Sequence, residues 1–121
     1  GSTVDISSIF ISNSGDKGIS IGEKSNVNVD KSEINHCKIG IAVKDESSAV
    51  ISNTGINNCE YGLAVYQKKP DFGPANVFAN SVNIKDSYLD YIVEEKSTLL
   101  VDEIEISGEF KNVYSKLYEN L

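Results

Sequence analysis

A repeat of 22 residues is the feature that most constrains the fold of this chain. Gly18-Ile19, Gly40-Ile41 and Gly62-Leu63 follow one another at intervals of 22 positions, and Cys37 and Cys59 are separated by the same interval. Self-similarity at a short fixed period indicates stacked units, none of which can bury its apolar face alone. The repeat therefore predicts a solenoid.

Within each repeat, apolar residues alternate with small or polar ones. Ile39, Ile41 and Val43 alternate with Gly40 and Ala42, which is the period of a β-strand. Strands this short form a continuous core only when successive coils stack in parallel, about 4.8 Å apart. The expected inward columns are Val27/Ala49/Val77/Leu99, Ile34/Ile56/Ile84/Ile106, Ile19/Ile41/Leu63/Tyr91 and Ile21/Val43/Val65/Val93.

The alignment predicts four to five coils over residues 3–108. A fourth coil aligns with the third at an offset of 28, which places six extra residues within an insertion at 66–76. The first coil aligns with the second at 23, and a partial fifth coil runs from Leu99 to Ile106. Gly1-Ser2 is interpreted as a cloning remnant and left out of the fold.

The pattern changes after Gly108. Apolar side chains then recur at helical spacing: Phe110, Val113, Tyr114, Leu117, Tyr118 and Leu121. A solenoid needs a cover on its last coil, because an open strand edge promotes aggregation. We interpret residues 109–121 as an amphipathic helix that caps the final coil; the alternative is the start of a linker.

The repeat Asn35-His-Cys37-Lys-Ile-Gly40-Ile41-Ala-Val43 resembles that of the pectin-lyase-like parallel β-helix superfamily, over roughly residues 4 to 106. The resemblance implies an all-β, right-handed, single-stranded parallel β-helix. Members include pectate lyases, polygalacturonases, phage tailspikes and adhesins. A lyase would imply an Arg or Lys base and several Asp residues around calcium. This chain has no Arg and no such Asp column, so no catalytic residue, metal or cofactor is assigned.

Charged residues change sign between stacked coils, as Lys38 and Glu60 illustrate. Opposite charges on adjacent strands stabilise a sheet modestly and help to set its register. Glu23 and Asp45 share a column at about 5 Å, which is the spacing of a retaining glycosidase pair. The alternating columns beside them instead favour solvated pairs between coils.

The remaining reactive side chains are expected to be structural. Cys37 and Cys59 stack in one inward column, where parallel in-register neighbours seldom have the geometry of a disulfide. They are predicted to be free buried thiols. His36 aligns with Asn58 and Asp86 and is predicted to be a polar turn residue, so a Cys/His zinc site is not expected.

Two features remain as candidate binding surfaces. The insertion contains Lys68, Lys69, Asp71 and Phe72 and follows Tyr66, a composition suited to an acidic or neutral glycan. The alternative for the insertion is a packing flap with Phe72 against the coil. The outward side of the Gly-Ile strands is expected to form a strip of small residues: Gly18, Ser20, Gly40, Ala42, Gly62 and Ala64. Such a strip predicts close contact with the insertion, the terminal helix, a partner domain or a ligand. The alternative is that glycine only eases strand packing at a bend.

The net charge of −7, with 11 Lys among 121 residues, is unsuited to nucleic acid, and no segment is apolar enough for membrane insertion. We expect a non-catalytic module of a larger bacterial surface or periplasmic protein, acting as a rigid scaffold or as a platform for polysaccharide or for another domain of the same protein. The alternative is the C-terminal part of a polysaccharide lyase or glycoside hydrolase with its active coils upstream. Self-association through the N-terminal coil is also expected.

Overall fold

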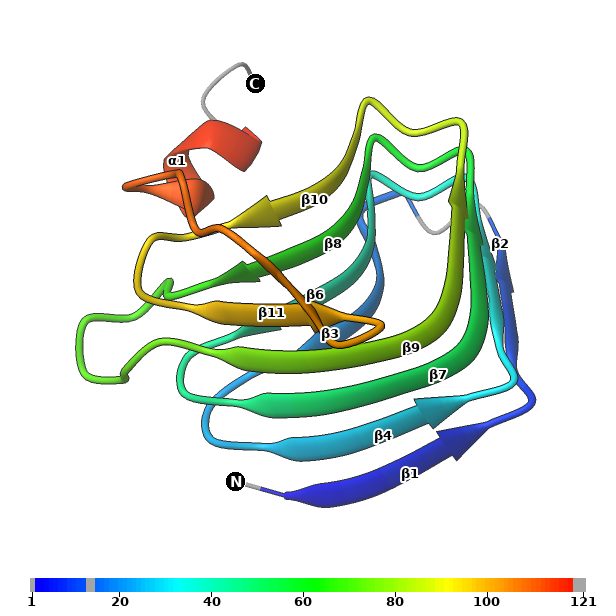
Figure 1. The fold of residues 1–121 in the computed structure, drawn as a ribbon, viewed down its shortest axis with the longest axis horizontal. Helices are drawn as coiled ribbons and strands as arrows, with labels where there is room; N and C mark the ends of the chain where they lie inside the picture. Colours follow the sequence, from blue (N-terminus) through cyan, green and yellow to red (C-terminus); the bar gives the residue numbers. More distant parts are fainter. Residues whose placement is uncertain (1, 13–14, 119–121) are drawn as a thin grey trace.

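The computed structural model describes residues 2–12 and 15–118 as a stack of parallel coils followed by a short C-terminal helix (Figure 1). One sheet contains β1 (Thr3–Ser7), β2 (Phe10–Ser12), β4 (Asn26–Asp30), β5 (Glu33–Asn35), β7 (Ser48–Asn57), β9 (Asn76–Lys85), β11 (Thr98–Val101) and β12 (Ile104–Ile106). The second sheet contains β3 (Lys17–Ile21), β6 (Ile39–Lys44), β8 (Tyr61–Tyr66) and β10 (Leu89–Val93).

The register of the strands confirms the three offsets expected from the sequence. Val4 pairs with Val27 at an offset of 23, and Val27 pairs with Ala49 at 22. Ile56 pairs with Ile84 at 28, so the six extra residues lie between β8 and β9. The inward columns form one core between the sheets, in which Ile34, Ile56 and Leu99 are fully buried.

Polar residues with left-handed backbone mark the corners of each coil. His36, Asn58 and Asp86 have φ angles of 56°, 57° and 58°, a region that favours Asn, Asp and His among residues other than glycine. The N–H of His36 donates to the carbonyl of Asn57 in the next coil at 3.1 Å, and that of Asn58 donates to Lys85 at 2.9 Å. His36 is therefore a turn residue, as the alignment predicted.

The repeated glycines lie at a tight corner and do not contribute to an outward strip as expected. A Cβ on Gly40 would lie 2.6 Å from Cγ2 of the core residue Ile56 and 2.7 Å from the carbonyl oxygen of Gly62. The side-chain direction therefore changes between Ile39 and Ile41. Ile39 packs in a second cluster on the outer face, and Ile41 packs in the core.

Only the first strand of the expected fifth coil continues the parallel stack. β11 continues the stack, because Leu99 pairs with Val77 in parallel, but β12 returns antiparallel and Ile106 pairs with Leu99. Asp102 and Glu103 between them have φ angles of 48° and 69°. Two consecutive positive φ angles form the two-residue hairpin turn that matches strand twist. The expected alignment of Ile106 with Ile84 is wrong for this reason.

The C-terminal helix is shorter than expected and covers a different surface. α1 (Val113–Tyr118) begins after Asn112, whose side-chain oxygen accepts the N–H of Ser115 at 3.0 Å as an N-cap. It cannot begin at 109 because Phe110 forms a β-bridge with Glu94. Residues 119–121 lie outside the described part of the chain.

The helix packs on the side of the second sheet instead of over the last coil. Val113 and Leu117 join Ala42 and Ala64 in a second apolar cluster, whose other buried members are Ile39, Tyr61, Tyr66 and Ile92. The small side chains of Ala42 and Ala64 leave room for a helix close to the sheet. The terminal helix was one of the partners expected for the small-residue strip, and two residues of that strip, Ala42 and Ala64, do pack in the same cluster as α1. In the described chain, α1 is far too short to cross a membrane.

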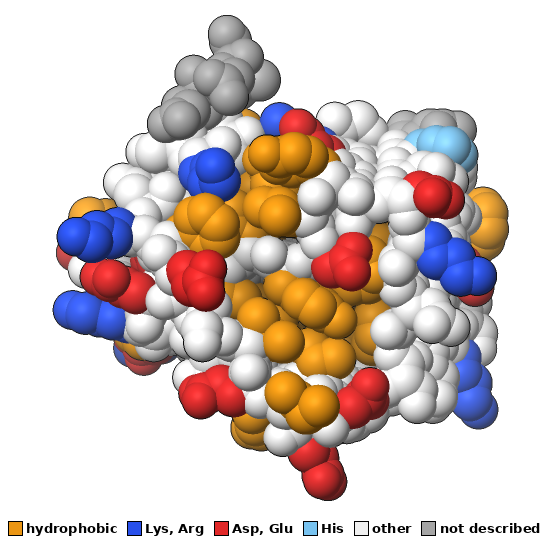
Figure 2. All heavy atoms as spheres, turned by 45° about the horizontal axis from the view of Figure 1, so that its top comes forward, with side chains coloured by type: hydrophobic (Ala, Val, Ile, Leu, Met, Phe, Trp, Pro, Cys, Tyr) orange, Lys and Arg blue, Asp and Glu red, His pale blue; other side chains and the backbone are white. Residues whose placement is uncertain are grey.

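The last coil is consequently covered only in part. Val82, Ile84, Tyr91, Val101 and Ile106 are half-buried against the core. In Figure 2, hydrophobic side chains gather at the centre of the visible face, with acidic and basic side chains around them. The capping role expected for residues 109–121 is therefore not what the helix does.

Candidate functional site

Two carboxylates in the turn that follows β6, Asp45 and Glu46, hold the insertion in place. Oδ1 of Asp45 accepts the N–H groups of Lys68 and Lys69 at 2.7 and 2.8 Å, and the Asp45 side chain is fully buried. Oε1 of Glu46 accepts the N–H of Gly73 at 2.8 Å. The expectation that Asp45 forms a solvated pair between coils is wrong, because its carboxylate satisfies backbone donors that have no strand partner.

The predicted glycan-binding residues separate into exposed and buried groups. Lys68, Lys69 and Asp71 are exposed on the insertion, and Phe72 is half-buried with its ring centre 6.0 Å from Nζ of Lys24. Tyr66 is fully buried in the cluster under α1, and its hydroxyl has no partner among the described residues. Burial raises the pKa of Tyr66, and nearby Tyr118 and Asp45 add to the effect. Tyr66 therefore cannot contact a ligand in this conformation.

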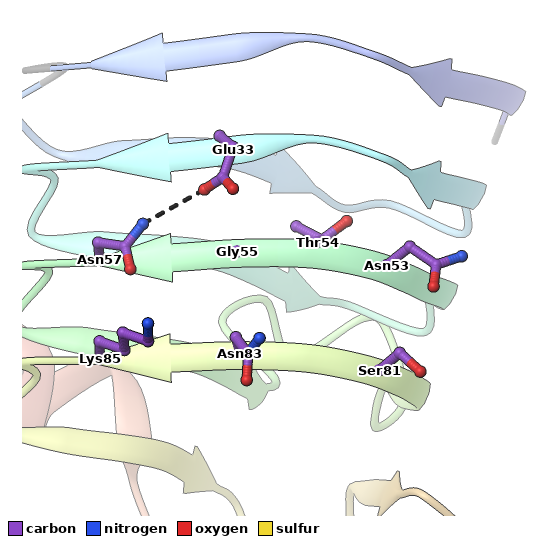
Figure 3. Close-up of a pocket in the computed structure, with 8 residues that line it drawn as sticks. All are labelled: Glu33, Asn53, Thr54, Gly55, Asn57, Ser81, Asn83 and Lys85. Atoms are coloured by element: carbon purple, nitrogen blue, oxygen red, sulfur yellow. Dashed lines mark hydrogen bonds between the residues drawn. The ribbon is translucent and has the colours of Figure 1, made fainter.

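A polar hollow of about 460 Å³ lies on the outer face of β5, β7 and β9 (Figure 3). The residues that line it are Glu33, Asn53, Thr54, Gly55, Asn57, Ser81, Asn83 and Lys85. In the strand register Gly55 pairs with Glu33 on one side and with Asn83 on the other. Gly55 has no side chain, so it forms the floor between two polar neighbours.

Hydrogen bonds position the side chains around this hollow. Nδ2 of Asn57 donates to Oδ1 of Asn35 at 2.9 Å and to Oε2 of Glu33 at 3.3 Å, which is the contact drawn in Figure 3. The Glu33 carboxylate leans over Gly55, where a Cβ would lie 2.9 Å from its Cδ. Asn53 and Ser81 stand at the bend, with φ angles of 49° and 55°.

The hollow offers many hydrogen-bonding groups and little apolar surface. The amides of Asn57 and Asn83 both donate and accept, the Glu33 carboxylate accepts, and the Lys85 ammonium donates. Such a set can pair with a ligand that carries several hydroxyl groups. Sequence reasoning missed this site. The signal was a glycine aligned with Glu33 and Asn83 in an outward column that is otherwise polar.

The other candidate chemical groups remain structural. Cys37 and Cys59 are buried free thiols, as predicted, and the N–H of Cys37 lies 3.4 Å from Sγ of Cys59. Burial raises the pKa of Cys59 and makes it a poor nucleophile. Lys38 pairs with Glu60 at 3.2 Å between coils, as expected. Within residues 2–12 and 15–118, no group of three or more His, Cys, Asp or Glu could hold a metal ion.

Comparison with known proteins identified one related family. A family model described as a right handed beta helix region matches residues 1–108, which is most of the chain. The matched region ends before α1. No curated protein and no solved structure matched the chain.

Proposed function

This chain belongs to the right-handed β-helix family, and we propose that it is a non-catalytic polysaccharide-binding module of a larger bacterial surface or periplasmic protein. The polar hollow on β5, β7 and β9 carries the proposal. Its lining combines donors and acceptors from three neighbouring coils, and a linear polymer of hydroxylated units presents donors and acceptors in a repeating order.

The rigidity of the platform supports a binding role. Parallel strands hold Glu33, Gly55 and Asn83 in register across three coils, at the spacing of about 4.8 Å between strands. A preformed site avoids the entropic cost of ordering side chains when the ligand binds.

Affinity electrophoresis against a panel of neutral and acidic polysaccharides tests this proposal. Wild-type protein should be retarded by at least one polymer. Asn83→Ala removes a donor and acceptor, and Gly55→Val fills the floor, so each should reduce retardation several-fold. Asn28→Ala is the matched control, since Asn28 is an exposed residue of β4 outside the hollow.

Two results would defeat the proposal. One is no retardation by any polymer, and the other is full retardation of both hollow variants. Incubation of the chain and of the longer protein with polyuronates addresses the enzymatic alternative. Cleavage by the longer protein alone would assign the chain to the terminal part of a lyase or hydrolase instead.

A further inference from the structure

A second hollow, of about 340 Å³, lies beside the insertion on the outer side of the second sheet. Its lining is rich in cations and consists of Ser20, Gly22, Glu23, Lys44, Lys68 and Lys69. None of these residues lines the polar hollow on β5, β7 and β9. The two sites are therefore independent of each other.

The backbone around this second hollow is held firmly. Asp45 fixes Lys68 and Lys69 through their N–H groups at 2.7 and 2.8 Å. Gly22 keeps space open next to the Lys44 ammonium, because a Cβ at Gly22 would lie 3.3 Å from Nζ of Lys44. The lysine side chains thus surround a space that the fold leaves empty.

The positive charge of this hollow is only partly neutralised. Lys44 is half-buried and donates from Nζ to Oγ of Ser20 at 2.8 Å. In the described part of the chain, no carboxylate lies within 4.0 Å of the Lys44 or Lys68 ammonium, whereas Lys69 pairs with Glu23. Burial lowers the pKa of Lys44 and the neighbouring lysines lower it further, while the Asp45 carboxylate offsets part of this effect.

The overall composition of the chain is acidic and does not lead one to expect this cluster of lysines. The chain carries a net charge of −7, and its other lysines include two that pair with acids in adjacent coils, Lys24 and Lys38. A half-buried ammonium beside like charges is unfavourable unless an anion compensates it. A bound anion would supply that compensation at Lys44.

We propose that this hollow is a binding site for an oxyanion, namely a carboxylate, sulfate or phosphate group carried by a small ligand or a sugar. Lys44 and Lys68 donate charged hydrogen bonds to the oxyanion, and the Ser20 hydroxyl donates a third. Lys69 adds its charge, and Glu23 competes with the ligand for the Lys69 ammonium. The Glu23 carboxylate weakens the site by repulsion.

Isothermal titration calorimetry at low ionic strength tests the site with three probes: sodium glucuronate, sodium sulfate and sodium phosphate. At least one should bind to the wild-type protein, with an affinity that falls as salt is added. Preference for glucuronate would assign a sugar carboxylate, and equal binding of all three would assign a general oxyanion site. Failure of all three to bind overturns the proposal.

Four single variants test the roles of the side chains. Lys44→Gln and Lys68→Gln should each weaken binding about tenfold or more, the contribution of a charged hydrogen bond. Glu23→Gln should strengthen binding because it frees Lys69, and unchanged affinity would contradict the role given to Lys69. Lys96→Gln is the matched control at an exposed lysine outside the hollow.

Lys68 makes the test independent of folding. Its side chain is exposed, with Nζ 5.2 Å from the ring centre of the exposed Tyr114, so Lys68→Gln should change the melting temperature little even if Lys44→Gln is less stable. Wild-type affinity in both Lys44→Gln and Lys68→Gln would overturn the proposal. So would equal losses of affinity in Lys68→Gln and Lys96→Gln.

Discussion

Replacement of Gly40 by alanine tests the view that the repeated glycine is demanded by contact between coils. The new Cβ would lie 2.6 Å from Cγ2 of Ile56 and 2.7 Å from the carbonyl oxygen of Gly62. Carbon atoms in contact prefer separations of about 3.5–4.0 Å, so the overlap is close to 1 Å. One obstacle is backbone and the other is a fully buried core side chain, and neither can move freely.

This cost is partly offset because alanine lowers the conformational entropy of the unfolded chain. Overpacking of this kind costs about 1–3 kcal/mol, whereas replacing glycine by alanine without strain stabilises by about 0.4–1 kcal/mol. Gly40→Ala should therefore destabilise the protein by about 1–2 kcal/mol. At roughly 4 °C per kcal/mol for a domain of this size, the melting temperature should fall by about 4–8 °C.

Gly22→Ala provides the matched control. A Cβ at Gly22 would meet only the flexible side chain of Lys44, at 3.3–3.4 Å. We expect Gly22→Ala to change the free energy of unfolding by less than about 0.5 kcal/mol. Urea denaturation followed by circular dichroism measures both variants. If Gly40→Ala is as stable as wild type, or if both variants lose equal stability, the corner has room for a methyl group and contact between coils does not require glycine.

Three further predictions concern the core, the insertion and the thiols. Ile56→Ala should lower the free energy of unfolding by about 2–5 kcal/mol, as truncation of a buried side chain does. Glu60→Ala should lower it by under about 1 kcal/mol because its ion pair is exposed. Similar urea midpoints for the two variants would contradict the column assignment. Asp45→Ala should release the insertion and make the peptide bond after Lys68 sensitive to trypsin, which gel analysis of a digestion time course measures. Unchanged resistance to trypsin would mean that the Asp45 carboxylate is not needed to hold the insertion. The two cysteines should stay unreactive toward a thiol reagent until urea unfolds the protein, and rapid labelling in buffer would show that the core opens locally.

The repeat predicted the coils because each coil reuses the same backbone geometry. The 28-residue offset between Ile56 and Ile84 could be found since the columns on both sides of the insertion remained intact. The sequence did not reveal the reversal at Asp102 and Glu103. Ile104 and Ile106 have the same alternation in a parallel or an antiparallel strand. The left-handed pair at Asp102 and Glu103 does not distinguish the alternatives either, because Asp45 and Glu46 form such a pair at a corner where the parallel stack continues.

The sites were harder to predict than the fold. The amphipathic pattern of Val113 and Leu117 predicts a helix but not the surface that it covers, which depends on how the chain returns after β12. Asp45 looks like any charged turn residue in the sequence, because its role is to bind backbone N–H groups of a distant loop. Tyr66 ends an otherwise buried strand, and its burial follows only from the position of α1.

The position of α1 also bears on how this chain folds and unfolds. In a simple solenoid each coil contacts only its neighbours, so the coils at the two ends fray independently. The free energy of unfolding is then the sum of one contribution from each coil and one from each interface between neighbouring coils. Here the hydroxyl of Tyr118 lies 3.0 Å from Oδ1 of Asp16 in the first coil, 102 residues away, while Oε2 of Glu94 in the fourth coil accepts the N–H of Val113 at 3.0 Å. The helix thus joins early and late coils into one cooperative unit. Such distant contacts raise the contact order, which slows folding, and in hydrogen exchange they should make amides of the early and late coils open together.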